Sequence, residues 1–398
     1  MSDPARTAAR SRPTYSPREM LERLVAFDTT SRNSNLALIE FVEDYLDAYS
    51  VPHWRAANGD GKKTNLCATI GPARPGGIVL SGHSDVVPVD GQPWSTDPWT
   101  LVERDGKLFA RGTCDMKAFI AIGLALLPRM LERPLARPFH LAISYDEEVG
   151  CAGVGPMIDK MVETLPPVHA VIVGEPSDMG IVNAHKGITS HYVRIRGREA
   201  HSSQPHRGAS ANMAAGLLVA KLQQMAAARE AKPHPGSRFE PPYTSFNVGE
   251  LHGGTALNII PLDCWFSFEY RLHPGDDHDG IIAEFTRYAK DEVEPWLRRF
   301  HKDASITIEP RSKVPPLLPE DDGPAEALVR HLTGSNATGA VSYATEGGLF
   351  QHAGYSTVIC GPGSIDQAHQ PDEFISIEQL EAGTKFQQRL IEWAQGGA

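Results

Sequence analysis

The sequence has few cysteines, and their number and spacing exclude two classes of small domain. Five cysteines in 398 residues are odd in number, lie far apart and form no Cys-x-x-Cys pair. A disulfide framework or a structural zinc finger requires closely spaced pairs of cysteines. The pattern is typical of a protein kept in a reducing compartment, and we therefore expect a cytoplasmic location.

Long hydrophobic runs and an excess of positive charge are also missing. No run of about 18 apolar residues occurs, so the sequence predicts no helix that spans a membrane. The 38 Lys and Arg residues against 49 Asp and Glu residues give a net charge of -11. This balance argues against non-specific binding to nucleic acid or to an anionic membrane, although local basic pockets can still bind small acids.

The first 14 residues are basic and rich in alanine and arginine. A transit peptide and a frayed N-terminal tail both fit this composition. The segment contains Asp3 and lacks an apolar core, and these two features favour the tail.

Apolar residues make up 41% of the chain, which is enough for the cores of two or three domains. A capping box at Ser16 and Glu19 predicts the first helix, and residues 118–131 predict another. Short apolar runs at 77–80, 139–144 and 170–173 predict buried strands between helical stretches. This alternation predicts an α/β layer with a largely parallel sheet.

The pattern changes after about residue 185. The predicted strands there are 189–196, 244–250, 263–272 and 304–309, and the predicted helices are 210–225 and 279–296. Their βαββαβ order predicts an α+β module that is inserted into the first domain. Residues 1–185 and 313–398 are therefore expected to form one discontinuous domain, and residues 186–312 the inserted one.

Acidic and imidazole side chains occur at the ends of the predicted strands. In a parallel sheet, the carboxyl ends of the strands form the edge at which ligands bind. His83 and Asp85 follow one strand, and side chains two residues apart on a strand share a face. Asp85 is therefore able to accept a hydrogen bond from His83, as the partner of a metal-bound histidine does; a surface pair is the alternative.

Further carboxylates and a second histidine occur in comparable positions. Asp115 precedes a predicted helix, where it is either a metal ligand or a helix N-cap. Three adjacent carboxylates, residues 146–148, follow an apolar strand and repel one another unless cations neutralise them; a solvated turn is the alternative. Glu175 ends another strand, and His369 lies in a long polar loop with two glycines.

Histidines and carboxylates without thiolates suit zinc, cobalt or manganese in a catalytic site. Two histidines and three or four carboxylates exceed what one zinc ion needs. Two divalent metal ions that share a bridging carboxylate account for this number better.

Four motifs, in this order, resemble those of the metallopeptidase M20 family. They are SGHSDVVPVDG, ARGTCDMKAF, YDEEVGCAG and VGEPSDM. ARGTCDMK, NAHKG and GPGSIDQAHQPDEF are especially similar to the acetylornithine deacetylases of that family. The resemblance implies a zinc-peptidase-like α/β/α catalytic domain with an inserted ferredoxin-like lid, through which members usually form homodimers.

The resemblance also implies two divalent metal ions per subunit, with zinc as the expected metal and cobalt as the alternative. The implied ligands are His83 and Glu175 on the first metal, Asp115 bridging both, and Glu148 and His369 on the second. Members of the family tend to have a cis peptide bond after the bridging aspartate, which here joins Asp115 and Met116.

The resemblance makes Glu147 the general base that takes a proton from a metal-activated water and passes it to the leaving amine, and Asp85 the residue that orients His83. General acid–base help of this kind contributes roughly 10²–10⁴-fold. In the motif REAHSSQPH, His201 resembles the lid histidine that reaches the partner subunit's site and stabilises the oxyanion. His206 is the neighbouring candidate, with a position on a loop surface as its alternative.

Three more residues resemble substrate anchors. Asn258 and Arg271 match lid positions that hold polar groups of the substrate, and an Arg fork suits a carboxylate. An exposed strand residue is the alternative for Arg271. Glu346 is expected either to pair with the ammonium group of ornithine or to be a loop surface charge. Lys186, at the expected domain boundary, is interpreted as a solvated linker charge.

The implied activity is removal of the acetyl group from N2-acetyl-L-ornithine, which yields L-ornithine and acetate in arginine biosynthesis. Succinyl-diaminopimelate desuccinylase, acetylcitrulline deacetylase and broad aminoacylase activities are alternatives within the same chemistry. A catalytically silent relative that only binds ligands is an alternative from another class, and it would be expected to lack the base or a metal ligand. The expected partner is a small N-acyl amino acid, with no nucleic acid and no membrane.

Overall fold

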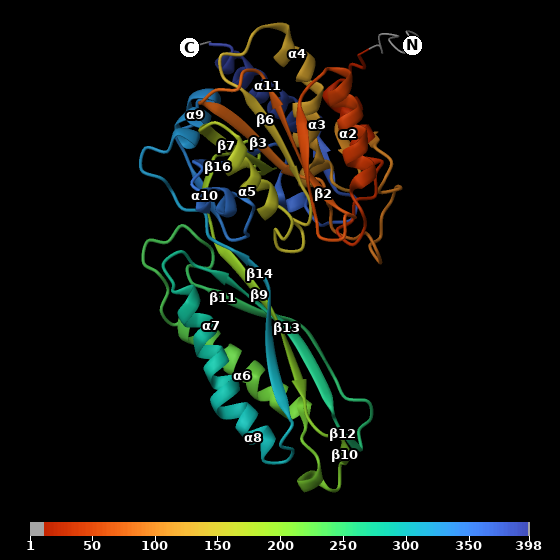
Figure 1. The fold of residues 1–398 in the computed structure, drawn as a ribbon, viewed down its shortest axis with the longest axis vertical. Coiled ribbons are helices and arrows are strands. Elements are labelled where there is room, and N and C mark those ends of the chain that lie inside the picture. The colour runs from red at the N-terminus through yellow and green to blue at the C-terminus, as the bar shows by residue number, and fades with distance from the viewer. Residues whose placement is uncertain (1–11, 397–398) are drawn as a thin grey trace, which may run out of the picture. The chain divides into compact units, whose positions relative to one another are not determined.

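The computed structural model describes residues 12–396, so the predicted N-terminal tail lies outside it up to residue 11. The chain divides into two compact units (Figure 1). Unit 1 comprises Met1–Asn183, Pro319–Gly339 and Thr345–Ala398, and unit 2 comprises Ala184–Leu318 and Ala340–Ala344. No helix within residues 12–396 has the length and hydrophobicity needed to cross a membrane.

An eight-stranded sheet in the order β1-β2-β6-β3-β7-β16-β8-β15 lies mostly in unit 1. Its strands are β1 (His53–Ala57), β2 (Thr64–Ile70), β3 (Gly77–His83), β6 (Phe139–Ser144), β7 (Val168–Pro176), β8 (Val182–His185), β15 (Gly339–Val341) and β16 (Thr357–Gly361). A smaller antiparallel sheet contains β4 (Val102–Arg104), β5 (Lys107–Phe109) and β17 (Phe374–Ser376).

The prediction of a largely parallel sheet is right only for the four central strands. β6, β3, β7 and β16 are parallel to one another. β1 and β2 pair antiparallel, β2 is antiparallel to β6, and β8 is antiparallel to β16. The short turn at residues 58–63 joins β1 to β2, and such a turn allows only antiparallel pairing because a parallel pair needs a long crossover.

Helices cover both faces of this sheet, which confirms the predicted α/β layering (Figure 1). The helices of unit 1 are α1 (Pro17–Val25), α2 (Leu36–Ala48), α3 (Ala118–Ala125), α4 (Leu127–Glu132), α5 (Gly155–Thr164), α9 (Pro324–Thr333), α10 (Gly347–His352) and α11 (Ile377–Ala394). The capping box that was expected at Ser16 and Glu19 is present at the start of α1. The helix predicted at 118–131 is divided at Leu126, just before Pro128, because proline cannot donate the helical hydrogen bond.

Unit 2 contains the predicted βαββαβ order and forms a four-stranded antiparallel sheet in the order β11-β13-β9-β14. This is the ferredoxin-like arrangement. Its main elements are β9 (Gly187–Arg196), α6 (Ala211–Glu230), β11 (Ser245–Gly253), β13 (Asp263–Leu272), α7 (His278–Arg287), α8 (Glu294–Arg298) and β14 (Ser305–Val314). The helices pack on one face of the sheet over a separate hydrophobic core. A separate short antiparallel pair consists of β10 (Ala200–His201) and β12 (Ile259–Ile260).

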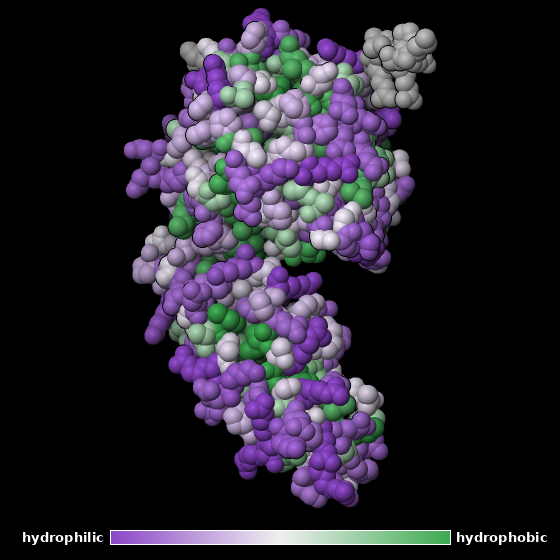
Figure 2. Space-filling view, in the orientation of Figure 1, coloured by the Kyte–Doolittle hydropathy of each residue, from purple (hydrophilic) through white to green (hydrophobic). Residues whose placement is uncertain are grey.

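Hydrophilic residues cover most of the surface that Figure 2 shows, and hydrophobic residues appear in small separate areas. In unit 2, the exposed hydrophobic side chains include Met213 and Leu217 on α6 and Leu251 on β11. These two elements contact each other, and β11 is an edge strand of its sheet.

Candidate metal centre

Neighbouring strands of the large sheet carry predicted site residues to one edge. β3 ends at His83, which pairs with Ser144, the last residue of β6. β7 runs parallel to β3 on its other side and carries Glu175 near its end. The parallel register therefore brings these residues to the same edge, as the sequence predicts.

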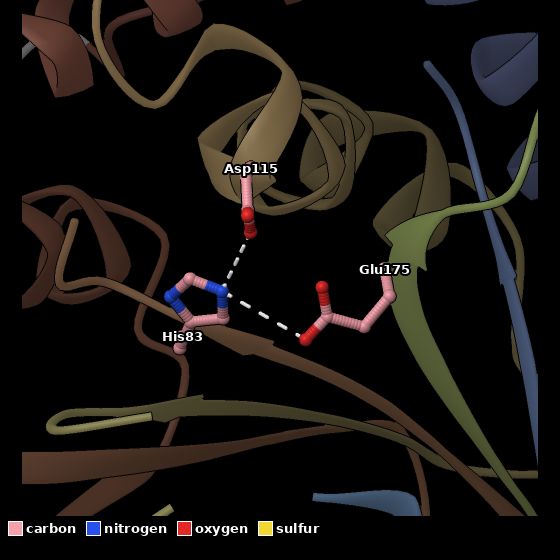
Figure 3. Close-up of side chains that lie close together, drawn as sticks. All are labelled: His83, Asp115 and Glu175. Atoms are coloured by element: carbon pink, nitrogen blue, oxygen red, sulfur yellow. Dashed lines mark hydrogen bonds and ion pairs between the residues drawn. The ribbon is translucent and has the colours of Figure 1, made fainter. Parts of the chain in front are cut away.

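Among residues 12–396, His83, Asp115 and Glu175 form one of two groups that are able to hold a metal ion (Figure 3). His83 Nε2 lies 2.9 Å from Asp115 Oδ1 and 3.8 Å from Glu175 Oε1. In Figure 3, one imidazole nitrogen faces both carboxylates, one from the turn before α3 and one from β7. All three side chains are buried.

Asp115, Glu148 and His369 form the second group. His369 Nε2 lies 3.0 Å from Glu148 Oε2 and 3.4 Å from Asp115 Oδ2. Asp115 therefore offers one carboxylate oxygen to each group. This is the arrangement that a carboxylate bridging two metal ions requires.

The backbone around Asp115 is fixed by a residue that the sequence reasoning missed. Asp115 does not cap α3, since the N-cap position is Lys117 and has no side-chain hydrogen bond. The carboxylate of Glu373 accepts hydrogen bonds from the backbone N–H groups of Cys114 at 2.8 Å and Asp115 at 3.0 Å. The peptide bond between Asp115 and Met116 is cis. Glu373 lies in the same polar loop as His369, but no sequence spacing shows that it reaches this turn.

Asp85 contacts His83 differently from the prediction. The sequence suggests a hydrogen bond from the imidazole to the Asp85 carboxylate, whose nearer oxygen lies 3.6 Å from His83 Nδ1. The backbone carbonyl of Asp85 accepts the hydrogen bond instead, at 2.9 Å. The carboxylate accepts hydrogen bonds from the Ser31 hydroxyl at 2.7 Å and from the backbone N–H of Glu147 at 3.2 Å. Asp85 thus connects the His83 strand to the turn that carries Glu147.

The three adjacent carboxylates point to different partners, which relieves their repulsion. Asp146 adopts a positive φ of 57°, and its carboxylate lies 2.5 Å from the Lys63 ammonium. Glu148 faces His369 in the second group. Glu147 Oε1 accepts a hydrogen bond from the Cys151 thiol at 3.2 Å. Lys63 is the neutralising cation of this turn, and it comes from a distant loop that the motif does not contain.

Burial shifts the pKa of two carboxyl groups of the cluster, and hydrogen bonds shift the pKa of two other members. Burial raises the pKa of Glu147 to about 8 and that of Glu148 to about 7, and neighbouring carboxylates add to both effects. Burial also opposes charge on Asp115, but hydrogen bonds from His369 and His83 outweigh it and lower the pKa of Asp115. Hydrogen bonds to Asp115 and Glu148 raise the pKa of His369 to about 10. Protonated imidazoles thus balance part of the carboxylate charge, as a metal cation would.

Glu346 is not a loop surface charge, because only 1% of it is exposed. Its Oε2 lies 3.4 Å from the Ser81 hydroxyl, and its Oε1 has no hydrogen-bond partner among residues 12–396. Burial raises the pKa of this carboxyl to about 7. Glu346 is therefore a buried acid with one unsatisfied oxygen, in the same unit as the two groups.

Two of the predicted lid residues, His201 and Asn258, lie side by side in unit 2. β10 pairs His201 with Ile259, and the Ser202 N–H donates to the Asn258 carbonyl at 3.0 Å. The side chain of His201 is exposed. Its Nδ1 accepts a hydrogen bond from the Ser203 N–H at 3.2 Å. Because an N–H only donates, the ring hydrogen of neutral His201 is on Nε2.

The remaining candidates of unit 2 differ in their surroundings. Arg271, on β13, is one-third exposed. Its Nε lies 3.0 Å from Glu269 Oε1, so one donor of the guanidinium group already has a partner. His206 is exposed in a short helical turn. The interpretation of Lys186 as a solvated charge is wrong, since it is fully buried. Its ammonium donates to the carbonyls of Pro241 at 2.6 Å and Tyr243 at 2.8 Å, which fixes the loop before β11.

Comparison with known proteins decides the family. Residues 79–393 match peptidase family M20/M25/M40. The chain belongs to this family. As an M20 member it is a hydrolase that acts on amide bonds.

The M20 relatives match nearly the whole chain. An acetylornithine deacetylase from Myxococcus xanthus is 36% identical over 375 residues, which are 91% of this chain and 93% of the relative. An M20 metallo-carboxypeptidase from Sulfolobus solfataricus has a TM-score of 0.74 at 16% identity, covering 96% of this chain and 100% of that one. A dinuclear metal-binding M20 peptidase from Bacillus subtilis has a TM-score of 0.59 at 15% identity, covering 96% and 99%. These M20 structures confirm the predicted fold class.

Proposed function

We propose that this protein is a dinuclear metal-dependent deacetylase that converts N2-acetyl-L-ornithine into L-ornithine and acetate. The observation that carries the proposal is the position of Asp115, whose two oxygens belong to two separate groups of metal-binding side chains. Relatives that match over nine-tenths of the chain and are named acetylornithine deacetylase support the substrate.

The residues of the centre fit two divalent cations. Each group offers one imidazole and carboxylate oxygens within 4.8 Å of one another. Mixed imidazole and carboxylate ligands suit zinc, and cobalt is the alternative. The description of the Bacillus subtilis relative as dinuclear supports the number. We assign the first metal to His83 and Glu175, the second to Glu148 and His369, and the bridging position to Asp115.

When bound, the cations supply Lewis-acid chemistry: they lower the pKa of a coordinated water and polarise the amide carbonyl. Glu147 is the general base, because its carboxylate lies beside both groups and is not a member of either. It takes the proton of the attacking water and passes it to the leaving amine. The Cys151 thiol and the backbone hydrogen bond to Asp85 hold Glu147 for this task.

His201 stabilises the oxyanion of the tetrahedral intermediate. Its Nε2–H is the free donor of the ring, since Nδ1 accepts from the Ser203 N–H. The resemblance to M20 lids supports its action on the site of a partner subunit in a homodimer. The exposed Met213, Leu217 and Leu251 on α6 and the edge strand β11 support a dimer contact at unit 2. Asn258 and Arg271 are the proposed anchors for the polar groups of the substrate, with the Arg fork on the carboxylate.

Metal binding is expected to stabilise the protein more as the pH rises from 5.5 to 7.5. Glu148 has a folded pKa of about 7, above its unfolded value, so its protonated form stabilises the metal-free protein at low pH and this contribution is lost as the pH rises. Coordination requires the deprotonated carboxylate and the neutral imidazole of His369. The difference in Tm between zinc-loaded and metal-free protein, measured at matched pH values, should therefore grow. A difference that is constant or shrinks would contradict the assignment of these ligands.

Glu346 is expected to select the positively charged side chain of ornithine. An ammonium group would satisfy its unpartnered oxygen and favour its ionised form. Glu346→Gln keeps the shape but loses the charge, and should lower kcat/KM for N2-acetylornithine by about 10- to 100-fold, as expected for a charge-assisted hydrogen bond. The value for N2-acetylcitrulline, whose side chain is neutral, should change little. An equal loss for both substrates would remove Glu346 from substrate selection.

The proposal is tested by reconstituting metal-free protein stepwise with zinc or cobalt and assaying hydrolysis after each addition. The substrates are N2-acetylornithine, N2-acetylcitrulline, succinyl-diaminopimelate and a set of N-acetyl amino acids. We expect two metal ions per subunit and the highest kcat/KM for N2-acetylornithine. A preference for the succinyl compound would favour a desuccinylase. No hydrolysis of any of them by protein with two bound metals would favour a ligand-binding relative without activity.

A further inference from the structure

Two of the three members of the second group, Asp115 and His369, lie far apart in the sequence, and a series of hydrogen bonds joins the segments that carry them. One segment is the turn with Asp115, and the other is the polar loop with His369. The joining residues are Glu373, Arg111 and Gln92, and none of them belongs to either metal-binding group.

Glu373 is the member of this hydrogen-bond series that contacts the turn with Asp115. Its carboxylate is 0% exposed, and both oxygens are used. Oε1 accepts from the N–H groups of Cys114 and Asp115, and Oε2 accepts from the Gly112 N–H at 3.0 Å and from Arg111 Nη1 at 2.8 Å. Three backbone donors on one carboxylate leave the turn little freedom, so Asp115 is held independently of His369.

Arg111 continues this series of hydrogen bonds toward the loop that carries His369. Its side chain is 1% exposed, and its guanidinium group lies 5.0 Å from the centre of the Trp94 ring. Nη1 donates to the Gln370 carbonyl at 3.2 Å, and Nη2 donates to Gln92 Oε1 at 2.5 Å. The planar guanidinium therefore fixes the orientation of the Gln92 amide.

Gln92 makes the last contact, to the backbone of His369. Its Oε1 accepts from Arg111 and from Trp94 Nε1 at 3.0 Å, which leaves its NH₂ group to donate. Nε2 donates to the His369 carbonyl at 2.9 Å. His369 adopts a φ of 63°, a left-handed conformation that non-glycine residues avoid. A hydrogen bond to its own carbonyl helps to hold the residue in this conformation.

We propose that Gln92 is a positioning residue that sets the affinity of the second metal position and leaves the first unchanged. The proposal rests on the proposed function, in which Asp115, Glu148 and His369 hold the second metal. His83 and Glu175 lie on strands of the central sheet, so these two ligands of the first position do not depend on the loop. Asp115, which both positions share, is held by Glu373. Gln92 contacts the His369 backbone directly, whereas Asp115 keeps its backbone hydrogen bonds to Glu373 when Gln92 is replaced, so the main effect falls on His369.

The test uses metal-free protein. Zinc binding is measured by calorimetric titration and fitted to two sites, and cobalt binding is followed in the visible absorption spectrum. Gln92→Glu keeps the acceptor for Arg111 and Trp94 but replaces the donor to the His369 carbonyl with a repelling oxygen. We expect the second binding step to weaken by about 10- to 100-fold, the range for loss of a hydrogen-bond partner behind a metal ligand. The first step should stay within about twofold of wild type. Gln92→Met, which neither donates nor accepts a hydrogen bond, should show the same selective loss.

Two control variants separate this role from a general loosening of the loop. Asp97→Asn alters the segment between β3 and β4 that also carries Gln92, where Asp97 accepts from Thr100 Oγ1 at 2.8 Å, and should change neither step. Glu373→Gln should weaken both steps, because Glu373 holds the shared Asp115. The role of Gln92 is overturned if wild-type protein binds two metals but Gln92→Glu and Gln92→Met weaken both binding steps equally, or neither step. That result leaves the proposed function intact. Wild-type protein that binds fewer than two metals overturns the proposed function and this inference with it.

Discussion

Glu147→Gln is expected to bind two metal ions as wild type does and to hydrolyse N2-acetylornithine at least about 100-fold more slowly. This factor is the low end of the contribution of a general base. Glutamine keeps the size of the side chain and can still interact with the Cys151 thiol, but it cannot accept the proton of the attacking water. The measurements are kcat by a stopped assay of acetate release and metal content by atomic absorption.

Glu148→Gln is the matched control, because it alters the neighbouring carboxylate of the same turn. Glu148 faces His369 at 3.0 Å, so its loss should weaken binding of one metal. The two variants should therefore differ in metal content: Glu147→Gln keeps both metals but turns over slowly, and Glu148→Gln loses a metal. Full activity in Glu147→Gln, or loss of metal from it, would show that the roles of this pair are assigned wrongly.

His201→Ala should bind metals normally and turn over about 10²- to 10³-fold more slowly, the usual effect of removing one oxyanion donor. The position of the ring hydrogen on His201 Nε2 also predicts which substitution retains more activity. Glutamine places an N–H donor near the position of Nε2, whereas asparagine places it near Nδ1. His201→Gln should therefore retain more kcat than His201→Asn, with KM changing less than kcat in both.

Subunit exchange tests whether His201 serves the partner. A mixture of His201→Ala and Glu147→Gln should regain about a quarter of the wild-type activity, because half of the random dimers of a twofold assembly are hybrids with one complete site. Each variant incubated alone is the control. Failure of the exchanged mixture to regain activity would place His201 in its own chain's site, or outside catalysis.

The gathering of the candidate metal-binding side chains could be predicted because simple rules connect it to the sequence. His83 and Glu175 end buried strands, and parallel strands bring their carboxyl ends to one edge. The inserted module was likewise recognisable from its order of strands and helices. The antiparallel flank of the large sheet was not, because a short apolar strand such as β2 carries no sign of its direction.

The residues that hold these candidate side chains in place could not be predicted. Glu373 reaches the Asp115 turn across 258 positions, and its partners are backbone N–H groups, which every residue offers. The contact of Asp85 with His83 uses a carbonyl, so the identity of the side chain does not reveal it. The burial of Lys186 and Glu346 also follows from tertiary packing, and each side chain is of a type that is usually exposed.

The discontinuity of unit 1 has a consequence for the order in which the chain is synthesised. Most of unit 2 is one continuous segment, Ala184–Leu318, so its sheet can form while the ribosome still extends the chain. The large sheet has to wait, because β16 pairs beside β7 and is made late. His369 and Glu373 emerge later still. Until then the nascent protein holds an incomplete cluster of acidic side chains, and a chain that stops before His369 lacks the imidazole of the second group.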